Sequence, residues 1–120
     1  MIDRVRLIGN WGLVKHGRVD TLGNYHPTAE RMNGQLIYAS DGSMSVLITK
    51  VPEPVMANDM IAYSGSFSVE GGKVLHHLKV SPYPIRLNTT EVRFASFRGD
   101  DLVLTTEPDQ GGRYEIVWRK

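Results

Sequence analysis

The sequence predicts an all-β protein: an antiparallel up-and-down β-barrel of about eight to nine strands. Three observations lead to this class. Apolar and polar residues alternate with a period of two through most of the chain, and no segment keeps a helical period. Turn-forming residues separate the alternating segments. A chain of 120 residues suits one hydrophobic core, so we expect a single domain over residues 1–120.

Eight segments have the alternation and composition of β-strands. They are residues 9–15, 35–39, 43–49, 60–69, 73–81, 91–98, 101–106 and 113–119, and residues 19–21 are a candidate ninth strand. Residues 22–33 and 52–59 interrupt the rhythm. Pro52 and Pro54 exclude a central strand from the second interruption. Each interruption has room for one helical turn at an end of the barrel.

Tight turns connect most of these strands. Asp41-Gly42 is the clearest, because this pair readily adopts the positive φ angles of a type I′ turn. Glycines in 70–72, 99–100 and 110–112 separate other pairs. A Greek-key sandwich needs long cross-connections, so this order favours a closed barrel. The interior of a barrel of about eight strands is either filled by side chains or holds one small ligand.

Composition argues against several classes of function. The 14 Lys and Arg residues nearly balance 13 Asp and Glu residues and are scattered singly, so we expect no nucleic-acid partner. The chain has no cysteine. No apolar run approaches the roughly 18 residues of a membrane span, and the N-terminus lacks a signal-peptide pattern. We therefore expect a cytoplasmic protein without a membrane partner, either a monomer or a homodimer.

Strand alternation places a histidine inside the barrel. His76 shares a face with Val74 and Leu78, whereas His77 points outside. A buried histidine is either satisfied by a neighbouring hydroxyl or carboxylate, or it contacts a ligand or transfers a proton. Neighbours on a strand cannot share an ion, so the sequence predicts no metal site, and it predicts no cofactor.

Two tyrosines and a methionine are further candidates for the interior. Tyr63 shares a face with Gly65 and Phe67, and Tyr38 lies opposite Met44 across the Asp-Gly hairpin. Each phenol has an apolar body and one hydroxyl, which suits a core or a pocket wall. Gly65 either bends its strand at a barrel corner or leaves room beside a ligand.

Several motifs occur in an order that points to a family. They are the G-x-W pattern Gly9-Asn10-Trp11 and the stretches 34–38 (GQLIY), 41–46 (DGSMSV), 62–67 (AYSGSF), 74–77 (VLHH) and 91–94 (EVRF). From Gly9 to Arg119 the chain resembles the small intracellular lipocalin-like proteins of bacteria and fungi. The resemblance implies a lipocalin-like, calycin-type barrel. It also implies that Arg119 packs across Trp11 and helps to close the barrel.

Arg93 is placed differently by two arguments. Val92 and Phe94 form the apolar face of their strand, which puts Arg93 outside. The resemblance matches Arg93 to an arginine that recurs in the family, and a buried arginine needs a carboxylate or an anionic ligand. We adopt the second interpretation and treat Arg93 as a functional residue.

No catalytic motif of the G-x-S-x-G, P-loop or G-x-G-x-x-G kind is present. The sequence therefore predicts a barrel that binds a small apolar or amphipathic molecule in a largely apolar interior. The predicted ligand-binding residues are Tyr38, Met44, Tyr63, His76 and Arg93.

Two alternatives stay open. One is a cofactor-free isomerase or cyclase acting on a carbonyl-bearing metabolite, with His76 as acid or base and the phenols or the guanidinium stabilising an enolate. The other is a packed structural barrel that acts through its surface. An interior below the few hundred Å³ of typical ligand pockets would favour this last alternative.

Overall fold

In the computed structural model, which describes residues 2–29, 31–51 and 60–120, nine strands form one antiparallel sheet that closes on itself. Each strand is hydrogen-bonded to its neighbours in the order β2-β1-β3-β4-β5-β6-β7-β8-β9, and β1 also pairs with β9. Of the strands in this described part, eight make the closed barrel and β2 lies outside it, on β1. The predicted up-and-down barrel is confirmed.

All eight predicted barrel strands are present, with ends shifted by up to a few residues. They are β1 (Gly9–Val19), β3 (Arg31–Tyr38), β4 (Ser43–Val51), β5 (Met60–Glu70), β6 (Lys73–Val80), β7 (Thr90–Arg98), β8 (Asp101–Thr106) and β9 (Arg113–Arg119). Two short helices that the alternation did not predict are α1 (Arg4–Leu7) and the 3-10 helix η2 (Pro84–Arg86).

The predicted ninth strand is in the wrong place. The extra strand is β2 (Tyr25–Pro27), and Val19 instead ends β1, where it pairs with Tyr25. Residues 22–33 therefore contain β2 and the start of β3, and no helix occurs in their described part. The helical turn expected within 52–59 lies outside the described residues.

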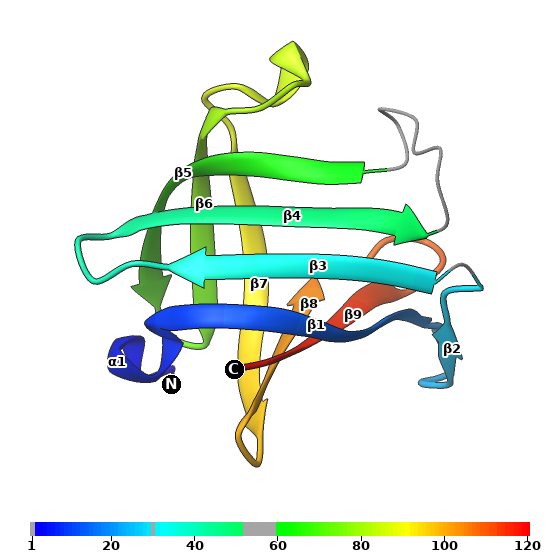
Figure 1. The fold of residues 1–120 in the computed structure, drawn as a ribbon. Helices are drawn as coiled ribbons and strands as arrows, with labels where there is room; N and C mark the ends of the chain where they lie inside the picture. Colours follow the sequence, from blue (N-terminus) through cyan, green and yellow to red (C-terminus); the bar gives the residue numbers. More distant parts are fainter. Residues whose placement is uncertain (1, 30, 52–59) are drawn as a thin grey trace.

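A sharp bend in β5 turns the sheet into a barrel. In Figure 1, β1, β3 and β4 run across the view, β6 and β7 run up and down behind them, and β5 bends from one direction into the other. The register with β6 shifts between Ser64 and Gly65. A Cβ atom on Gly65 would lie 1.9 Å from the carbonyl oxygen of His77, so only glycine allows this close approach. Of the two alternatives for Gly65, a bend at a barrel corner or room beside a ligand, the structure shows the bend.

The turn between β3 and β4 differs from the predicted type. Gly42 has a φ angle of +94°, but it is the only residue of the turn with a positive φ, whereas a type I′ turn needs two. Asp41 stabilises the turn through its side chain, because its Oδ1 accepts a hydrogen bond of 2.9 Å from the backbone N–H of Ser43.

The short helix α1 closes one end of the barrel. The backbone N–H of Ile2 donates to the carbonyl of Gly71 at 3.0 Å, and Arg6 Nη2 donates to the carbonyl of Gly99 at 3.2 Å. These bonds join the N-terminal segment to two hairpin loops. Leu7, the last residue of α1, is fully buried. We call this the closed end. Because the strands are antiparallel, their opposite ends meet at the other, open end.

Trp11 belongs to the closed end, but its cationic partner differs from the predicted one. The indole Nε1 donates to the carbonyl of Leu7 at 2.8 Å, and the ammonium of Lys120 lies 4.9 Å from the indole ring centroid. Arg119 instead makes two hydrogen bonds of 2.8 Å to the carboxylate of Asp101. The cation on Trp11 is therefore Lys120 rather than Arg119.

A hydrophobic core fills the interior next to the closed end. It joins α1 to the inner faces of the strands, and its buried members include Leu7, Trp11, Leu36, Val46, Phe67, Val74, Leu102, Leu104 and Trp118. Burial of apolar surface on this scale is the main favourable term in folding. This part of the barrel interior is packed. A surface hollow of about 670 Å³ lies outside it at the closed end, lined by Arg6, Trp11 and Asp101 among others.

Candidate ligand site

A buried histidine forms a polar centre within the barrel. His76 is 2 % exposed and lies between two phenols. Its Nε2 is 2.6 Å from the hydroxyl of Tyr38, and its Nδ1 is 2.6 Å from the hydroxyl of Tyr63. The predicted interior position of His76 is confirmed, and of the two alternatives left open for it the structure shows a histidine satisfied by hydroxyl groups. His77 faces outwards, as predicted, and contacts the hydroxyls of Ser68 and Thr90.

Burial keeps this polar centre uncharged. It lowers the pKa of His76 to about 3, and the positive charge of Arg93 adds to that effect. Burial also raises the pKa of Tyr63 to about 12 and raises the pKa of Tyr38 well above its usual value. At neutral pH the imidazole is therefore neutral, and both phenols keep their hydrogens.

A cavity of about 580 Å³ opens at the end of the barrel opposite α1. Met32, Ile61 and Ile116 supply apolar parts of its wall, and six of its lining residues are Lys, Arg, Asp or Glu. The full lining is His16, Met32, Lys50, Met60, Ile61, Arg86, Glu91, Val92, Arg93, Thr106, Glu107, Asp109, Tyr114 and Ile116. The largely apolar interior that was predicted is found in the packed core, whereas the cavity has a mixed lining.

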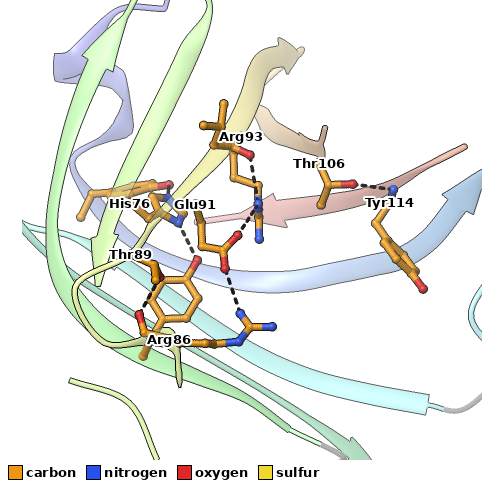
Figure 2. Close-up of polar contacts among 10 residues, drawn as sticks. His76, Arg86, Thr89, Glu91, Arg93, Thr106 and Tyr114 are labelled. Atoms are coloured by element: carbon orange, nitrogen blue, oxygen red, sulfur yellow. Dashed lines mark hydrogen bonds and ion pairs between the residues drawn. The ribbon is translucent and has the colours of Figure 1, made fainter. Parts of the chain in front are cut away.

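Two arginines share one carboxylate on the wall of this cavity. Glu91 Oε1 accepts a hydrogen bond of 3.1 Å from Arg86 Nη1, and Glu91 Oε2 lies 3.6 Å from Arg93 Nη1. Figure 2 shows Glu91 between the two guanidiniums. We call Arg86, Glu91 and Arg93 the guanidinium pair site. Its formal charges sum to one excess positive charge, which an anionic group would neutralise.

Arg93 points into the barrel, which overturns the placement based on alternation. Its side chain is 16 % exposed and lines the cavity, whereas Phe94 is 39 % exposed. Arg93 lies directly opposite the buried Val74 in the β6–β7 pair, and residues opposite one another share a face. The inner face of β7 therefore carries Glu91 and Arg93.

Another part of the cavity wall contains a histidine and a tyrosine. The ring centroids of His16 and Tyr114 are 5.6 Å apart, and His16 Nδ1 is 2.7 Å from the hydroxyl of Thr28. Burial lowers the pKa of His16. The hydroxyl of Thr106 accepts a hydrogen bond of 2.9 Å from the backbone N–H of Tyr114 (Figure 2). This wall offers a ligand flat aromatic surface.

A smaller cavity of about 290 Å³ adjoins the large one. It shares Met60, Ile61 and Arg86 with the large cavity and is also lined by Tyr63 and Tyr83. Tyr63 and the guanidinium pair site therefore line neighbouring cavities that have Arg86 in common.

The five predicted ligand residues are thus divided among three places. Arg93 lines the large cavity and Tyr63 lines the smaller one. Tyr38, Met44 and His76 are buried and line neither cavity.

Sequence reasoning missed Arg86, Glu91, His16 and Tyr114. Glu91 had a usable signal, because it lies two residues from Arg93 and so shares its strand face. Arg86 lies in η2, where no alternation indicates a direction.

Residues 2–29, 31–51 and 60–120 contain neither a cluster of metal-binding side chains nor a membrane-spanning helix. No three histidine or acidic side chains in this part are grouped so that they could hold a metal ion. No helix in the same part is long and apolar enough to cross a membrane.

The closed barrel with its open-ended cavity defines the calycin type of β-barrel protein. The chain belongs to the lipocalin-like domain family, whose model matches residues 8–120. No curated protein matches this chain in sequence.

Two solved structures share the fold. A lipocalin-like protein from Bacteroides uniformis superposes with a TM-score of 0.56 at 14 % identity, over 96 % of this chain and 98 % of that one. A mutant of the fluorescent protein UnaG superposes with a TM-score of 0.51 at 10 % identity, over 97 % of this chain and 96 % of that one. At these identities the likeness establishes the fold alone.

Proposed function

We propose that this protein binds a small amphipathic molecule in the cavity at the open end of the barrel. The anionic group of the ligand lies at the guanidinium pair site, and its apolar part contacts Met32, Ile61 and Ile116. The observation that carries this proposal is that Arg86 and Arg93 share a single carboxylate, that of Glu91, within a cavity of about 580 Å³.

The size of the cavity supports binding over a purely structural role. Ligand pockets in proteins typically enclose about 300–1,000 Å³, and this cavity falls within that range. The alternative of a barrel filled entirely by side chains fits the core near α1 but not the open end, where the cavity lies.

The charge of the guanidinium pair site supports an anionic group on the ligand at that point of the cavity. A largely buried guanidinium is costly unless it is paired and hydrogen-bonded. Among the described residues, Arg93 donates to the carbonyl of Val92 at 3.0 Å and has one carboxylate within 4.0 Å, that of Glu91. Glu91 is also bonded to Arg86, so a further anion is favoured beside the two cations.

The alternative of an isomerase or cyclase that uses His76 as its acid or base has less support. Both ring nitrogens are engaged by phenols, and burial lowers the pKa of His76 to about 3, far below the pH at which a proton shuttle works best. His76 also lines neither cavity.

A fluorescence titration with anilinonaphthalenesulfonate, an amphipathic anion, tests the proposal. We expect the wild-type protein to bind the probe and Arg93→Met to weaken binding by about tenfold or more, because a hydrogen bond to a charged group contributes roughly 1.5–3 kcal/mol. Arg98→Met is the matched control. It alters an exposed arginine of β7 that pairs with Glu115 and does not line the cavity. Equal affinity in wild type and Arg93→Met would refute the proposal.

A further inference from the structure

The two phenols beside His76 cannot play the same role. A neutral imidazole has one N–H donor and one lone-pair acceptor. Both ring nitrogens lie 2.6 Å from a phenol oxygen. One tyrosine therefore donates its hydrogen to the ring, and the other accepts the ring N–H. The accepting tyrosine keeps a hydroxyl hydrogen that needs a second acceptor.

The surroundings of Tyr38 identify it as the donor to the ring. Tyr38 is fully buried, and its ring centroid is 4.6 Å from that of Phe67 in the hydrophobic core. Among the described residues its hydroxyl has one hydrogen-bond partner, His76. If it accepted from the ring, its own hydrogen would be buried without a partner, which proteins avoid. Tyr38 therefore donates to Nε2, and the ring hydrogen lies on Nδ1.

Tyr63 then carries the unused hydrogen. The Nδ1–H of His76 donates to the hydroxyl oxygen of Tyr63, so the hydroxyl hydrogen of Tyr63 points away from the ring. Tyr63 lines the smaller cavity together with Arg86. Glu91 lies directly opposite His76 in the β6–β7 pair, which brings the guanidinium pair site next to this phenol.

We infer that the hydroxyl of Tyr63 is a hydrogen-bond donor to the ligand, and that the ligand is a carboxylate-bearing amphiphile. One carboxylate oxygen accepts from Tyr63, and the charge is held by Arg86 and Arg93. A carboxylate suits this set because it accepts several hydrogen bonds at once, and those from charged donors are strong. The inference rests on the proposed function and adds the chemical class of the ligand and a residue that selects it.

Electrostatics agrees with this assignment. Besides the larger effect of burial, the charges of Arg93 and Arg86 act to lower the pKa of Tyr63 and the charge of Glu91 acts to raise it, so the phenol lies within the field of all three members of the guanidinium pair site. The net pKa of about 12 means that Tyr63 remains protonated at neutral pH and able to donate.

Nitrogen-15 NMR of the wild-type protein tests the direction of the hydrogen bonds without any ligand. We expect His76 to show a protonated Nδ1 and an unprotonated Nε2. A protonated Nε2 would overturn the inference, because Tyr63 would then donate its hydroxyl hydrogen to Nδ1 of His76 and would have none left for a ligand. Since this measurement uses the wild type, it stands even where a variant fails to fold.

Binding measurements test the role of Tyr63 towards the ligand. We expect Tyr63→Phe to weaken the binding of naphthaleneacetate about tenfold, the loss of one hydrogen bond to a charged group. The affinity for ethylnaphthalene, which has no oxygen, should change by less than about twofold, because it forms no such bond. Tyr25→Phe is the control, since Tyr25 has a buried hydroxyl but lines neither cavity.

The outcomes separate the two proposals. If Arg93→Met weakens naphthaleneacetate binding and Tyr63→Phe does not, the inference about Tyr63 is wrong and the proposed function stands. If the wild type binds neither naphthaleneacetate nor anilinonaphthalenesulfonate, both are wrong. An equal loss for naphthaleneacetate and ethylnaphthalene in Tyr63→Phe also overturns the inference, because it indicates a change in cavity shape.

Discussion

The guanidinium of Arg93 and the carboxylate of Glu91 approach to 3.6 Å on the inner face of one strand, β7, where both side chains line the same cavity. Glu91 also accepts a hydrogen bond from Arg86. The carboxylate therefore competes with any anionic ligand for the two guanidiniums. Neutralising this carboxylate should therefore strengthen anion binding, which would not be expected of a cluster of arginines without an internal carboxylate.

Removing the charge of Glu91 should strengthen the binding of an anionic probe. In Glu91→Gln the two guanidiniums lose their internal counter-ion, so we expect anilinonaphthalenesulfonate to bind several-fold more tightly, by roughly 1 kcal/mol. Calorimetric titration measures this change. Glu70→Gln, at the exposed closed-end terminus of β5, should leave the affinity unchanged. Weaker binding by Glu91→Gln would mean that Glu91 positions the arginines rather than competing with the ligand.

A methyl group at the β5 corner should destabilise the fold. Gly65→Ala places a Cβ atom 1.9 Å from the carbonyl oxygen of His77, and the backbone must shift to relieve the clash. Overpacking of this kind costs about 1–3 kcal/mol or more. Gly72→Ala is the control, because a Cβ atom there meets no other atom within 4 Å. Urea denaturation compares the two variants, and equal midpoints would contradict the role of Gly65.

Tyr38→Phe should change stability with opposite signs in two backgrounds. In the wild type it removes a partner of His76 and costs about 1–2 kcal/mol. In His76→Leu, the hydroxyl of Tyr38 is already buried without a partner, so the same substitution should raise the free energy of unfolding. A double-mutant cycle in urea measures this coupling. The same cost in both backgrounds would show that the Tyr38–His76 hydrogen bond contributes nothing to stability.

Stability should fall as the pH is lowered through the range in which His76 titrates in the unfolded chain. The unfolded imidazole takes up a proton near pH 6.5, whereas the folded one does so only near pH 3. Between these values the unfolded state binds more protons, so acid favours unfolding. The slope from one such group is at most about 1.4 kcal/mol per pH unit.

Urea denaturation between about pH 4 and pH 7 measures this slope. Burial also lowers the pKa of His16, so this histidine contributes to the slope in the same direction. The variant His16→Asn measures how much of the slope His16 contributes. His76→Leu should reduce the slope by up to about 1.4 kcal/mol per pH unit, the contribution of one titrating group. The lowered pKa values of Asp20, Asp41 and Asp101 add to the loss of stability mainly below about pH 5. A wild-type stability that is constant from pH 4 to pH 6.5 would contradict a neutral, buried His76.

Sequence alternation was sufficient for β6 and insufficient for β7. In β6, Val74, His76 and Leu78 form one face that is clearly more buried than the other. In β7 both faces carry apolar and polar residues, so a period of two defines two faces without saying which one is inside. The register with β6, which sets Arg93 opposite Val74, decides the matter.

By itself, the sequence determined the class of fold, the eight barrel strands and the interior position of His76, and it narrowed Gly65 to a corner or a space beside a ligand. These follow from local properties: alternation with a period of two, turn residues, and the absence of a side chain on glycine. Only the tertiary structure decided the partners of His76, the inward direction of Arg93 and the joining of Arg86 to Glu91. Each of these depends on strand register and on loop positions, which are set by packing between segments distant in the chain, and a local pattern carries no record of that packing.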